Sequence, residues 1–244
     1  MKSKISKPPF LSVIIPLFNE QARLDRLWII YKYLKRKKFK YEVILVNDGS
    51  TDKTLDKIKD LTKEFNFKLI TYNDNKGKGY AIKTGMLQAK GRYKLFADID
   101  LSTPVDEMEK FLPILSKYDI LIGSRKMKGA NLEVRQPFLR EFLGQGFTFV
   151  SQLTLNLDIS DFTCGFKVFS NKASCLIFPK QKLNKWGFDP EILFIARKHN
   201  LSIKEIPVTW SNDLKSKVRF PQDIISSLID LCKIKYYHFR RRYD

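Results

Sequence analysis

YKLFADIDLSTP, residues 93–104, joins a short apolar run directly to two aspartates. Residues 93–97 have the apolar and aromatic composition of a buried β-strand. Asp98 and Asp100 follow at the carboxyl end of that strand, and Pro104 leads into a helix expected over residues 105–115. Ligands of open α/β sheets bind outside the carboxyl ends of the strands, so this stretch predicts both an α/β fold and the place of its functional site.

The same alternation of apolar runs and helical stretches extends over the first 125 residues. Further strands are expected at 11–17, 41–46, 68–72 and 120–123, and helices at 24–34, 55–65 and 79–89, with Ser50 capping the second helix. Farther along, we expect a long helix at 137–157, strands at 165–169 and 203–210, a helix at 190–198 and a basic amphipathic helix at 221–239. The sequence therefore predicts one α/β domain with a Rossmann-like, mostly parallel sheet flanked by helices.

The composition narrows the class of protein. The chain has 244 residues, 43% of them hydrophobic, and a net charge of +19. These values indicate one soluble domain with an acidic partner, which is nucleic acid, an anionic membrane surface or a phosphorylated substrate.

Residues 142–157 are the longest uncharged stretch. This stretch is too short and too polar to cross a bilayer, which takes about 20 apolar residues. The N-terminus does not resemble a signal peptide, so we expect a cytoplasmic protein whose three cysteines are reduced.

Polar side chains follow three of the expected strands. Asn19 and Glu20 follow the first strand, Asp48 the second, and Asp98 and Asp100 the fourth, so all are expected at one edge of the sheet. Crowded carboxylates repel one another unless a cation joins them. Asp98 and Asp100 are therefore candidates to hold Mg²⁺ or Mn²⁺, with the phosphates of a ligand completing the coordination shell. Taken alone, an Asp-x-Asp sequence is also compatible with an ordinary turn at the end of a strand.

A glycine-containing loop precedes the third expected helix. Residues 75–81, NKGKGYA, bring backbone N–H groups and Lys78 to the start of that helix, where proteins bind phosphate. The spacing excludes a Walker loop. The alternative is an ordinary connecting loop with solvated lysines.

Seven ordered segments resemble the family 2 glycosyltransferases of the GT-A fold, between residue 11 and about residue 231. SVIIPLFNE (12–20), VNDGSTD (46–52) and the turn at 98–100 are similar to the nucleotide-binding strands and the metal motif of that family. NKGKG (75–79), FADIDLSTP (96–104), GSR (123–125), DFTCGFK (161–167) and WGFDPE (186–191) resemble the branch that contains dolichyl-phosphate β-glucosyltransferase. Asn47 departs from the pattern, because the family commonly has an aspartate there.

The resemblance implies a nucleotide-sugar donor, UDP-glucose in the first place, bound by residues 10–125. The choice between UDP-glucose and GDP-mannose stays open. The residues implied to bind the nucleotide sugar are Pro16, Phe18, Asn19, Glu20, Asp48, Lys78 and Asp98. Asp98 and Asp100 would hold Mg²⁺ or Mn²⁺, and Lys78 would add a second positive charge beside the diphosphate.

The resemblance also implies an acceptor, a dolichyl or undecaprenyl phosphate, bound by residues 126–220. Candidates to bind its phosphate are Arg125, Arg135, Arg140 and Lys217, with surface solvation as the alternative. Asp161 would position the acceptor, act as a base or cap local backbone, and it forms the implied catalytic set with Asp100 and Arg125. Because a phosphate oxygen is already anionic, its in-line attack needs no strong base and inverts the anomeric centre.

The tail is expected to attach the enzyme to a membrane. Eukaryotic members of this branch carry an N-terminal membrane anchor, whereas residues 1–9 here read as a flexible basic segment. The basic helix within 221–244 is expected to dock its apolar stripe on the sheet and to bring Arg240, Arg241 and Arg242 to anionic lipid headgroups at the cytoplasmic face. The alternative is that these arginines are only solvated.

Three other functions stay open at this point. A family 2 enzyme that builds a surface polysaccharide or glycan would use a sugar hydroxyl as nucleophile and would need Asp161 or Asp189 as base. Asp189 and Glu191 could equally complement a helix dipole.

A nucleic-acid-binding protein would explain the charge, but no recognition helix, zinc knuckle or RNA-binding motif occurs, so we expect no nucleic-acid partner. A scaffold without activity is the third, and the Asp98/Asp100 pair argues against it.

Overall fold

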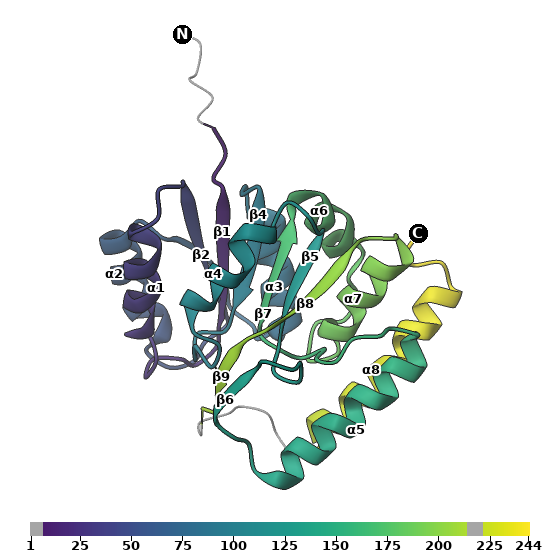
Figure 1. Cartoon of the computed structure of the whole chain (residues 1–244). Coiled ribbons are helices and arrows are strands. Elements are labelled where there is room, and N and C mark those ends of the chain that lie inside the picture. Colours follow the sequence, from purple (N-terminus) through teal and green to yellow (C-terminus); the bar gives the residue numbers. More distant parts are fainter. Residues whose placement is uncertain (1–6, 214–221) are drawn as a thin grey trace.

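The computed structural model describes residues 7–213 and 222–244 and contains a central seven-stranded sheet with helices on both faces (Figure 1). In spatial order the strands are β3 (Lys68–Tyr72), β2 (Tyr41–Asp48), β1 (Leu11–Leu17), β4 (Tyr93–Ala97), β7 (Phe166–Ser170), β5 (Ile120–Ser124) and β8 (Ile203–Pro207). Only β7 runs antiparallel to its neighbours β4 and β5. The mostly parallel α/β sheet predicted from the sequence is confirmed.

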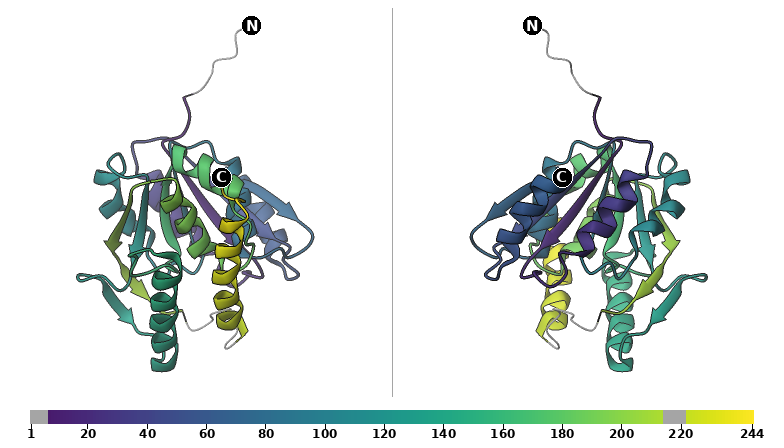
Figure 2. Two further views of the ribbon diagram at one scale, coloured as in Figure 1. Left: turned by 90° about the vertical axis from the view of Figure 1, so that its right-hand side faces the viewer. Right: turned by 90° about the vertical axis from the view of Figure 1, so that its left-hand side faces the viewer.

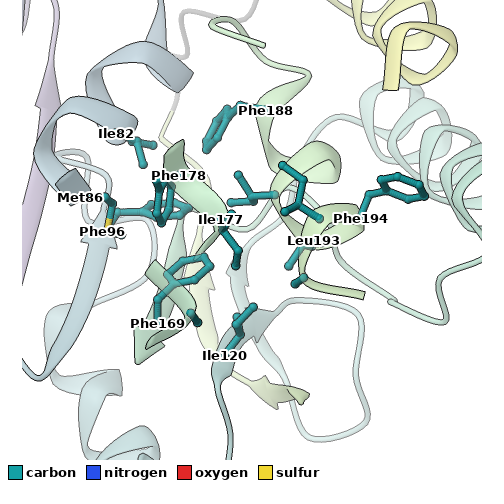
Figure 3. Packing of buried hydrophobic residues seen from close by; sticks show 14 of the residues in the cluster. Ile82, Met86, Phe96, Ile120, Phe169, Ile177, Phe178, Phe188, Leu193 and Phe194 are labelled. Carbon is teal, nitrogen blue, oxygen red and sulfur yellow. The ribbon is translucent and has the colours of Figure 1, made fainter. Parts of the chain in front are cut away.

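The two faces of the sheet bury alternate residues of each strand, as the period of two requires. Val13 and Ile15 of β1 pack toward α1 (Arg26–Lys35), α2 (Thr54–Phe65) and α4 (Met108–Phe111). Ile14 faces the opposite side, where α3 (Lys78–Gln88), α6 (Asn171–Lys180) and α7 (Phe188–Lys198) close the second core. Figure 3 shows the aromatic centre of that second core, in which Phe96, Phe169 and Phe178 lie beside Ile177 and Phe188. The two cores fix the strand ends that carry the site.

The structure departs from the sequence-based expectations at several elements. The expected helix at 105–115 is a short α4 between two 3₁₀ turns, Val105–Glu107 and Leu112–Ile114, because Pro113 cannot donate a backbone hydrogen bond. Helix α6 was not predicted, since its polar residues and Pro179 obscure the apolar stripe. The hydroxyl of Ser50 accepts from the backbone N–H of Asn19 at 3.0 Å instead of capping α2.

The expected strand at 203–210 was also wrong in extent, because it is two strands. After β8 the chain crosses to β9 (Thr209–Ser211), which pairs with β6 (Asn131–Val134) in a separate two-stranded sheet. Pro207 ends β8, where its missing N–H terminates the ladder. This small sheet stands beside the carboxyl ends of the central strands.

Helices α5 (Phe138–Leu155) and α8 (Gln222–Phe239) contact each other and form one side of the molecule (Figures 1 and 2). The apolar stripe of α8 was expected to dock on the sheet, and this was wrong, because α8 packs on α5 and α7. Leu231 and Ile234 are buried there, whereas other apolar residues of α8 face outward. Within the described residues, no helix is long and apolar enough to cross a membrane.

Candidate active site

The acidic turn after β4 is held rigidly. The backbone N–H of Leu101 donates to the carbonyl of Asp98 at 3.2 Å, and that of Ser102 donates to Oδ1 of Asp100 at 3.0 Å. The guanidinium of Arg26 donates to the carbonyl oxygen of Asp100. Leu101 has a φ of 45°, in the left-handed region that side chains other than Gly, Asn and Asp seldom adopt. Strain of this kind persists only where neighbouring contacts enforce it, and it is common at functional sites.

Lys78 provides the nearest cation to these carboxylates. Its Nζ lies 2.7 Å from Oδ1 of Asp98 and 5.4 Å from the centre of the Trp186 ring. Burial disfavours the charged lysine, but Asp98, Asp189 and Asp100 outweigh that effect and raise its pKa. The pKa of Asp100 is raised by burial and by the charge of Asp98. The turn therefore carries more negative charge than the single lysine balances.

This donor set fits a hard divalent cation. Within the described residues, no third His, Cys, Asp or Glu lies close enough to Asp98 and Asp100 to act as a further metal ligand. A site with two carboxylates and open positions suits Mg²⁺ or Mn²⁺, which bind through few protein ligands together with phosphates and water. Burial and the charge of Asp98 raise the pKa of Asp100, and a cation bound by both carboxylates would stabilise their charged forms.

Gly165 permits the chain to pass directly over Asp98. A Cβ atom at residue 165 would lie 1.9 Å from Oδ2 of Asp98. The carbonyl of Gly165 accepts from the backbone N–H of Asp98 at 3.3 Å. The segment before β7 thus lies directly against the side chain of Asp98. Glycine at position 165 leaves room for that carboxylate, which any larger residue would displace.

The predicted nucleotide contacts lie at the carboxyl ends of β1 and β2 and brace each other. Asn19 accepts the backbone N–H of Thr51 at 2.7 Å, which links the two strand ends. Glu20 forms a salt bridge of 2.7 Å with Arg23. Pro16 pairs with Val46 between β1 and β2, and Phe18 is half-buried just after β1. The structure brings these residues to one edge, and their contact with a nucleotide stays a prediction.

Asp48 shapes the loop after β3. Its buried carboxylate accepts from the backbone N–H groups of Lys76 at 2.8 Å and Gly77 at 2.9 Å. Gly77 has a φ of 101°, and a Cβ there would lie 2.5 Å from the carbonyl oxygen of Asn184. Asp48 therefore positions the start of α3, and with it Lys78, a role that the sequence reasoning missed.

Arg125 and Asp161 form a bidentate ion pair at the end of β5. Nε of Arg125 donates to Oδ2 of Asp161 at 2.6 Å, and Nη2 donates to Oδ1 at 2.7 Å. Nη2 also donates to the hydroxyl of Thr163 at 2.9 Å, and the guanidinium lies 5.3 Å from the Trp210 ring. Burial alone would raise the pKa of Asp161, but Arg125 lowers it to about 2. Asp161 is therefore a permanent anion that orients Arg125.

Two of the other predicted phosphate ligands, Arg140 and Arg135, lie within the described residues. Arg140, in the first turn of α5, is half-buried, and its pKa is lowered by burial and by the charge of Arg125. Arg135 is exposed just after β6. Lys217 lies outside the described residues. Arg125 and Arg140 are thus brought together.

A buried pair, Lys167 and Asp189, was missed by the sequence reasoning. Lys167 is fully buried and donates to the carboxylate of Asp189 and, at 2.7 Å, to the carbonyl of Cys164. The charge of Asp189 contributes to raising the pKa of both Lys78 and Arg125, so it acts on both parts of the site. A lysine inside the apolar strand GFKVF was the available signal.

Glu191 lies in the first turn of α7, where a carboxylate complements the helix dipole, and it has a further structural role. Its fully buried carboxylate accepts from the backbone N–H groups of Lys182 at 2.9 Å and Leu183 at 2.8 Å. The hydroxyl of Tyr243 donates to it at 2.7 Å. Burial raises the pKa of Glu191, although these donors oppose the change. Glu191 joins the end of the chain to the loop that contacts Gly77.

Comparison with known proteins places these features in context. A family model described as glycosyl transferase family 2 matches residues 12–176. A dolichyl-phosphate beta-glucosyltransferase of Trichomonas vaginalis is 35% identical over 242 residues, which cover 93% of this chain and 71% of that protein. The dolichyl-phosphate beta-glucosyltransferase of Saccharomyces cerevisiae is 34% identical, with 93% and 74% covered, and that of Homo sapiens is 34% identical, with 85% and 69% covered.

Solved structures share the fold. Glucosyl-3-phosphoglycerate synthase from Mycobacterium tuberculosis, in complex with Mn²⁺ and uridine-diphosphate-glucose, matches with a TM-score of 0.62 at 16% identity, covering 92% of this chain and 79% of that chain. Mannosyl-3-phosphoglycerate synthase from Rubrobacter xylanophilus matches with a TM-score of 0.68 at 13% identity, covering 96% and 74%. The GT-A-type architecture predicted from the sequence is confirmed.

Proposed function

This chain belongs to glycosyl transferase family 2, and from that premise we propose that it transfers a hexose from a nucleotide sugar to a polyprenyl phosphate. We propose glucose from UDP-glucose as the donor group and a dolichyl or undecaprenyl phosphate as the acceptor. The names of the relatives, which are dolichyl-phosphate beta-glucosyltransferases, support this choice. The observation that carries this proposal is the Arg125–Asp161 pair. The pair fixes a guanidinium after β5, at the same edge of the sheet as the Asp98 turn after β4.

On the donor side, Asp98 and Asp100 would hold Mg²⁺ or Mn²⁺, which when bound neutralises the diphosphate and makes it a better leaving group. Lys78 adds a positive charge at the same place and is held there by Asp98. The residues at the ends of β1 and β2, including Asn19, Glu20 and Asp48, shape the edge on which the nucleotide would lie.

On the acceptor side, Arg125 and Arg140 would bind the phosphate, since guanidinium groups match phosphate oxygens. A phosphate oxygen forms the bond to C1 of the sugar while the bond from C1 to the diphosphate oxygen breaks, which inverts the anomeric centre. The pKa of Asp161, about 2, makes it a poor base for a hydroxyl nucleophile. This argues against Asp161 as the base of the sugar-hydroxyl alternative, and the other candidate base, Asp189, accepts a hydrogen bond from Lys167.

The experiment is a transfer assay with the full chain, a short water-soluble polyprenyl phosphate, Mn²⁺ or Mg²⁺, and a panel of radiolabelled nucleotide sugars. We expect label from one donor to enter the organic phase, and Asp100→Asn to lower the rate by about a hundredfold or more. Asp106→Asn, an exposed aspartate shortly after the turn, is the matched control and should retain activity. If nucleotide binds but no donor transfers its sugar to the phosphate, the acceptor is a hydroxyl.

A lipid acceptor also requires a membrane. We propose that the enzyme works as a peripheral protein at the cytoplasmic face of an anionic membrane, to which its net charge of +19 would attract it.

A further inference from the structure

Most of the large hydrophobic side chains that are exposed in the described residues lie on α5 and α8. The members on α5 are Phe138, Leu139, Phe142, Phe149, Val150 and Leu153, and those on α8 are Ile225, Leu228, Ile229, Tyr236 and Phe239. We call these eleven side chains the α5/α8 surface. Scattered exposed apolar residues are normal on proteins, but a gathered set of this size indicates a surface that meets an apolar partner.

The outer face of α5 is apolar. Phe138, Phe142, Phe149 and Leu153 follow at helical spacing and are 84%, 61%, 61% and 68% exposed. No charged residue occurs from Phe142 to Leu157. The opposite face of the helix, which the protein covers, includes Ser151 and Leu155. A helix on the surface of a soluble protein presents its charged side to water, so this face suits a different medium.

The exposed stripe of α8 is bordered by cations. At 100° per residue, Ile225, Ile229 and Tyr236 share one face, with Lys233 on one margin and Lys235 on the other. Asp223 and Asp230 lie on the buried side. An apolar stripe with lysines along its edges is the arrangement of a helix that lies in a bilayer interface.

The far end of α8 offers a place for an anion. A hollow of about 290 Å³ is lined by Lys182, Tyr236, Tyr237, Arg240 and Arg242. Three of these side chains are cations and none is acidic, while Tyr236 also belongs to the stripe. The hollow therefore suits an anionic group at the edge of an apolar layer.

The α5/α8 surface is joined to the candidate acceptor site. Nζ of Lys126, the residue after Arg125, donates to the carbonyl of Gly144 in α5 at 3.2 Å and contacts Thr148. The charge of Arg125 lowers the pKa of Arg140 in the first turn of the same helix. Figure 2 shows α5 and α8 extending beyond the sheet. A molecule that approaches along α5 would thus reach Arg125.

Building on the lipid acceptor of the proposed function, we propose that the α5/α8 surface docks on an anionic lipid bilayer. The apolar face of α5 enters the acyl region, and the hollow at the end of α8 binds lipid headgroups. A second copy of the chain is the competing occupant, but two molecules of charge +19 repel each other, whereas an anionic bilayer attracts them. The proposed membrane contact therefore includes the apolar face of α5 as well as the basic tail.

The test is flotation of the full chain with vesicles of phosphatidylcholine that contain anionic phosphatidylglycerol. We expect Phe142→Gln/Phe149→Gln to weaken binding by about tenfold or more, because two inserted rings are lost. Ile29→Gln/Leu87→Gln is the matched control, since these side chains are 51% and 48% exposed on other helices, and it should bind as wild type. Circular dichroism and thermal unfolding confirm that both variants fold.

A second pair of changes tests the hollow. Arg240→Gln/Arg242→Gln should lower the preference for anionic over neutral vesicles and leave insertion of α5 in place. An unchanged preference would overturn the assignment of headgroups to the hollow.

Three results would overturn the docking proposal. The first is a wild-type chain that does not bind anionic vesicles, and the second is a Phe142/Phe149 variant that binds them as wild type does. The third is a wild-type protein that is dimeric and a Phe142/Phe149 variant that is monomeric, with vesicle binding unchanged. The last result would assign the α5/α8 surface to a second copy. Failure of the proposed function is a separate outcome, because transfer to a short water-soluble polyprenyl phosphate requires no vesicle. Wild type and the Phe142/Phe149 variant should be equally active in that assay.

Discussion

Replacing Asp161 with asparagine removes the charge that holds Arg125 and leaves the side-chain shape almost unchanged. The Asp161 side chain is 1% exposed and that of Arg125 is 18% exposed, so the arginine would keep its charge in a largely dry place. The carboxyl pKa falls from 3.8 to about 2 in the folded protein. At about 1.4 kcal/mol per pKa unit, this shift corresponds to about 2–3 kcal/mol of folding free energy.

Loss of one partner from a buried ion pair commonly costs about 3–5 kcal/mol, and the remaining amide oxygen can still accept one hydrogen bond. We therefore expect Asp161→Asn to lower the free energy of unfolding by about 2–4 kcal/mol at pH 7. The measurement is urea unfolding followed by tryptophan fluorescence, in which Trp210 lies directly beside the pair. Asp158→Asn, an exposed aspartate three residues earlier, should stay within about 0.5 kcal/mol of wild type.

The pH dependence gives the sharper test. Because the folded pKa of Asp161 lies below its unfolded value, its contribution is fully present above about pH 5 and is lost as the pH falls toward 2. The stability difference between wild type and Asp161→Asn should therefore be constant from pH 7 to pH 5 and shrink in more acidic solution. A cost below about 0.5 kcal/mol at pH 7, or one that stays constant into the acidic range, would refute this account of the pair.

Two further changes test other contacts. Lys78→Gln removes the cation beside Asp98, and we expect KM for the nucleotide sugar to rise about tenfold or more while the fold is retained, as measured by initial rates and circular dichroism. Wild-type kinetics would remove Lys78 from the donor site. Tyr243→Phe leaves Glu191 short of one donor, and we expect a loss of about 1–3 kcal/mol in urea unfolding, whereas Tyr236→Phe, on the exposed face of α8, should cost nothing measurable.

The parts of the fold that the sequence predicts are those set by local patterns. β1, β3 and β4 have the bounds expected from the sequence, because each is a short segment rich in apolar residues between predicted helices or loops. α6 was missed because its stabilisation comes from packing on β7 and α7, while its own stripe is interrupted by polar residues. Tertiary contacts of this kind override propensity.

The candidate site was predictable where its residues are neighbours in the chain. Asp98 and Asp100 stand together after one strand, so their proximity needs no knowledge of the fold. The Arg125–Asp161 pair joins residues 36 positions apart, and the sequence could name both without pairing them. The pairing of Lys167 with Asp189 was not predicted, because burial of a charge is visible only once the fold supplies its partner.

The contact between Gly165 and Asp98 has an evolutionary consequence. Any side chain at residue 165 would have to push the aspartate aside, while the cores on both faces of the sheet would be left intact. If the proposed donor site is right, a duplicated gene could lose sugar transfer through one codon change at this position. Among related copies in one genome, we therefore expect glycine here in those that transfer a sugar.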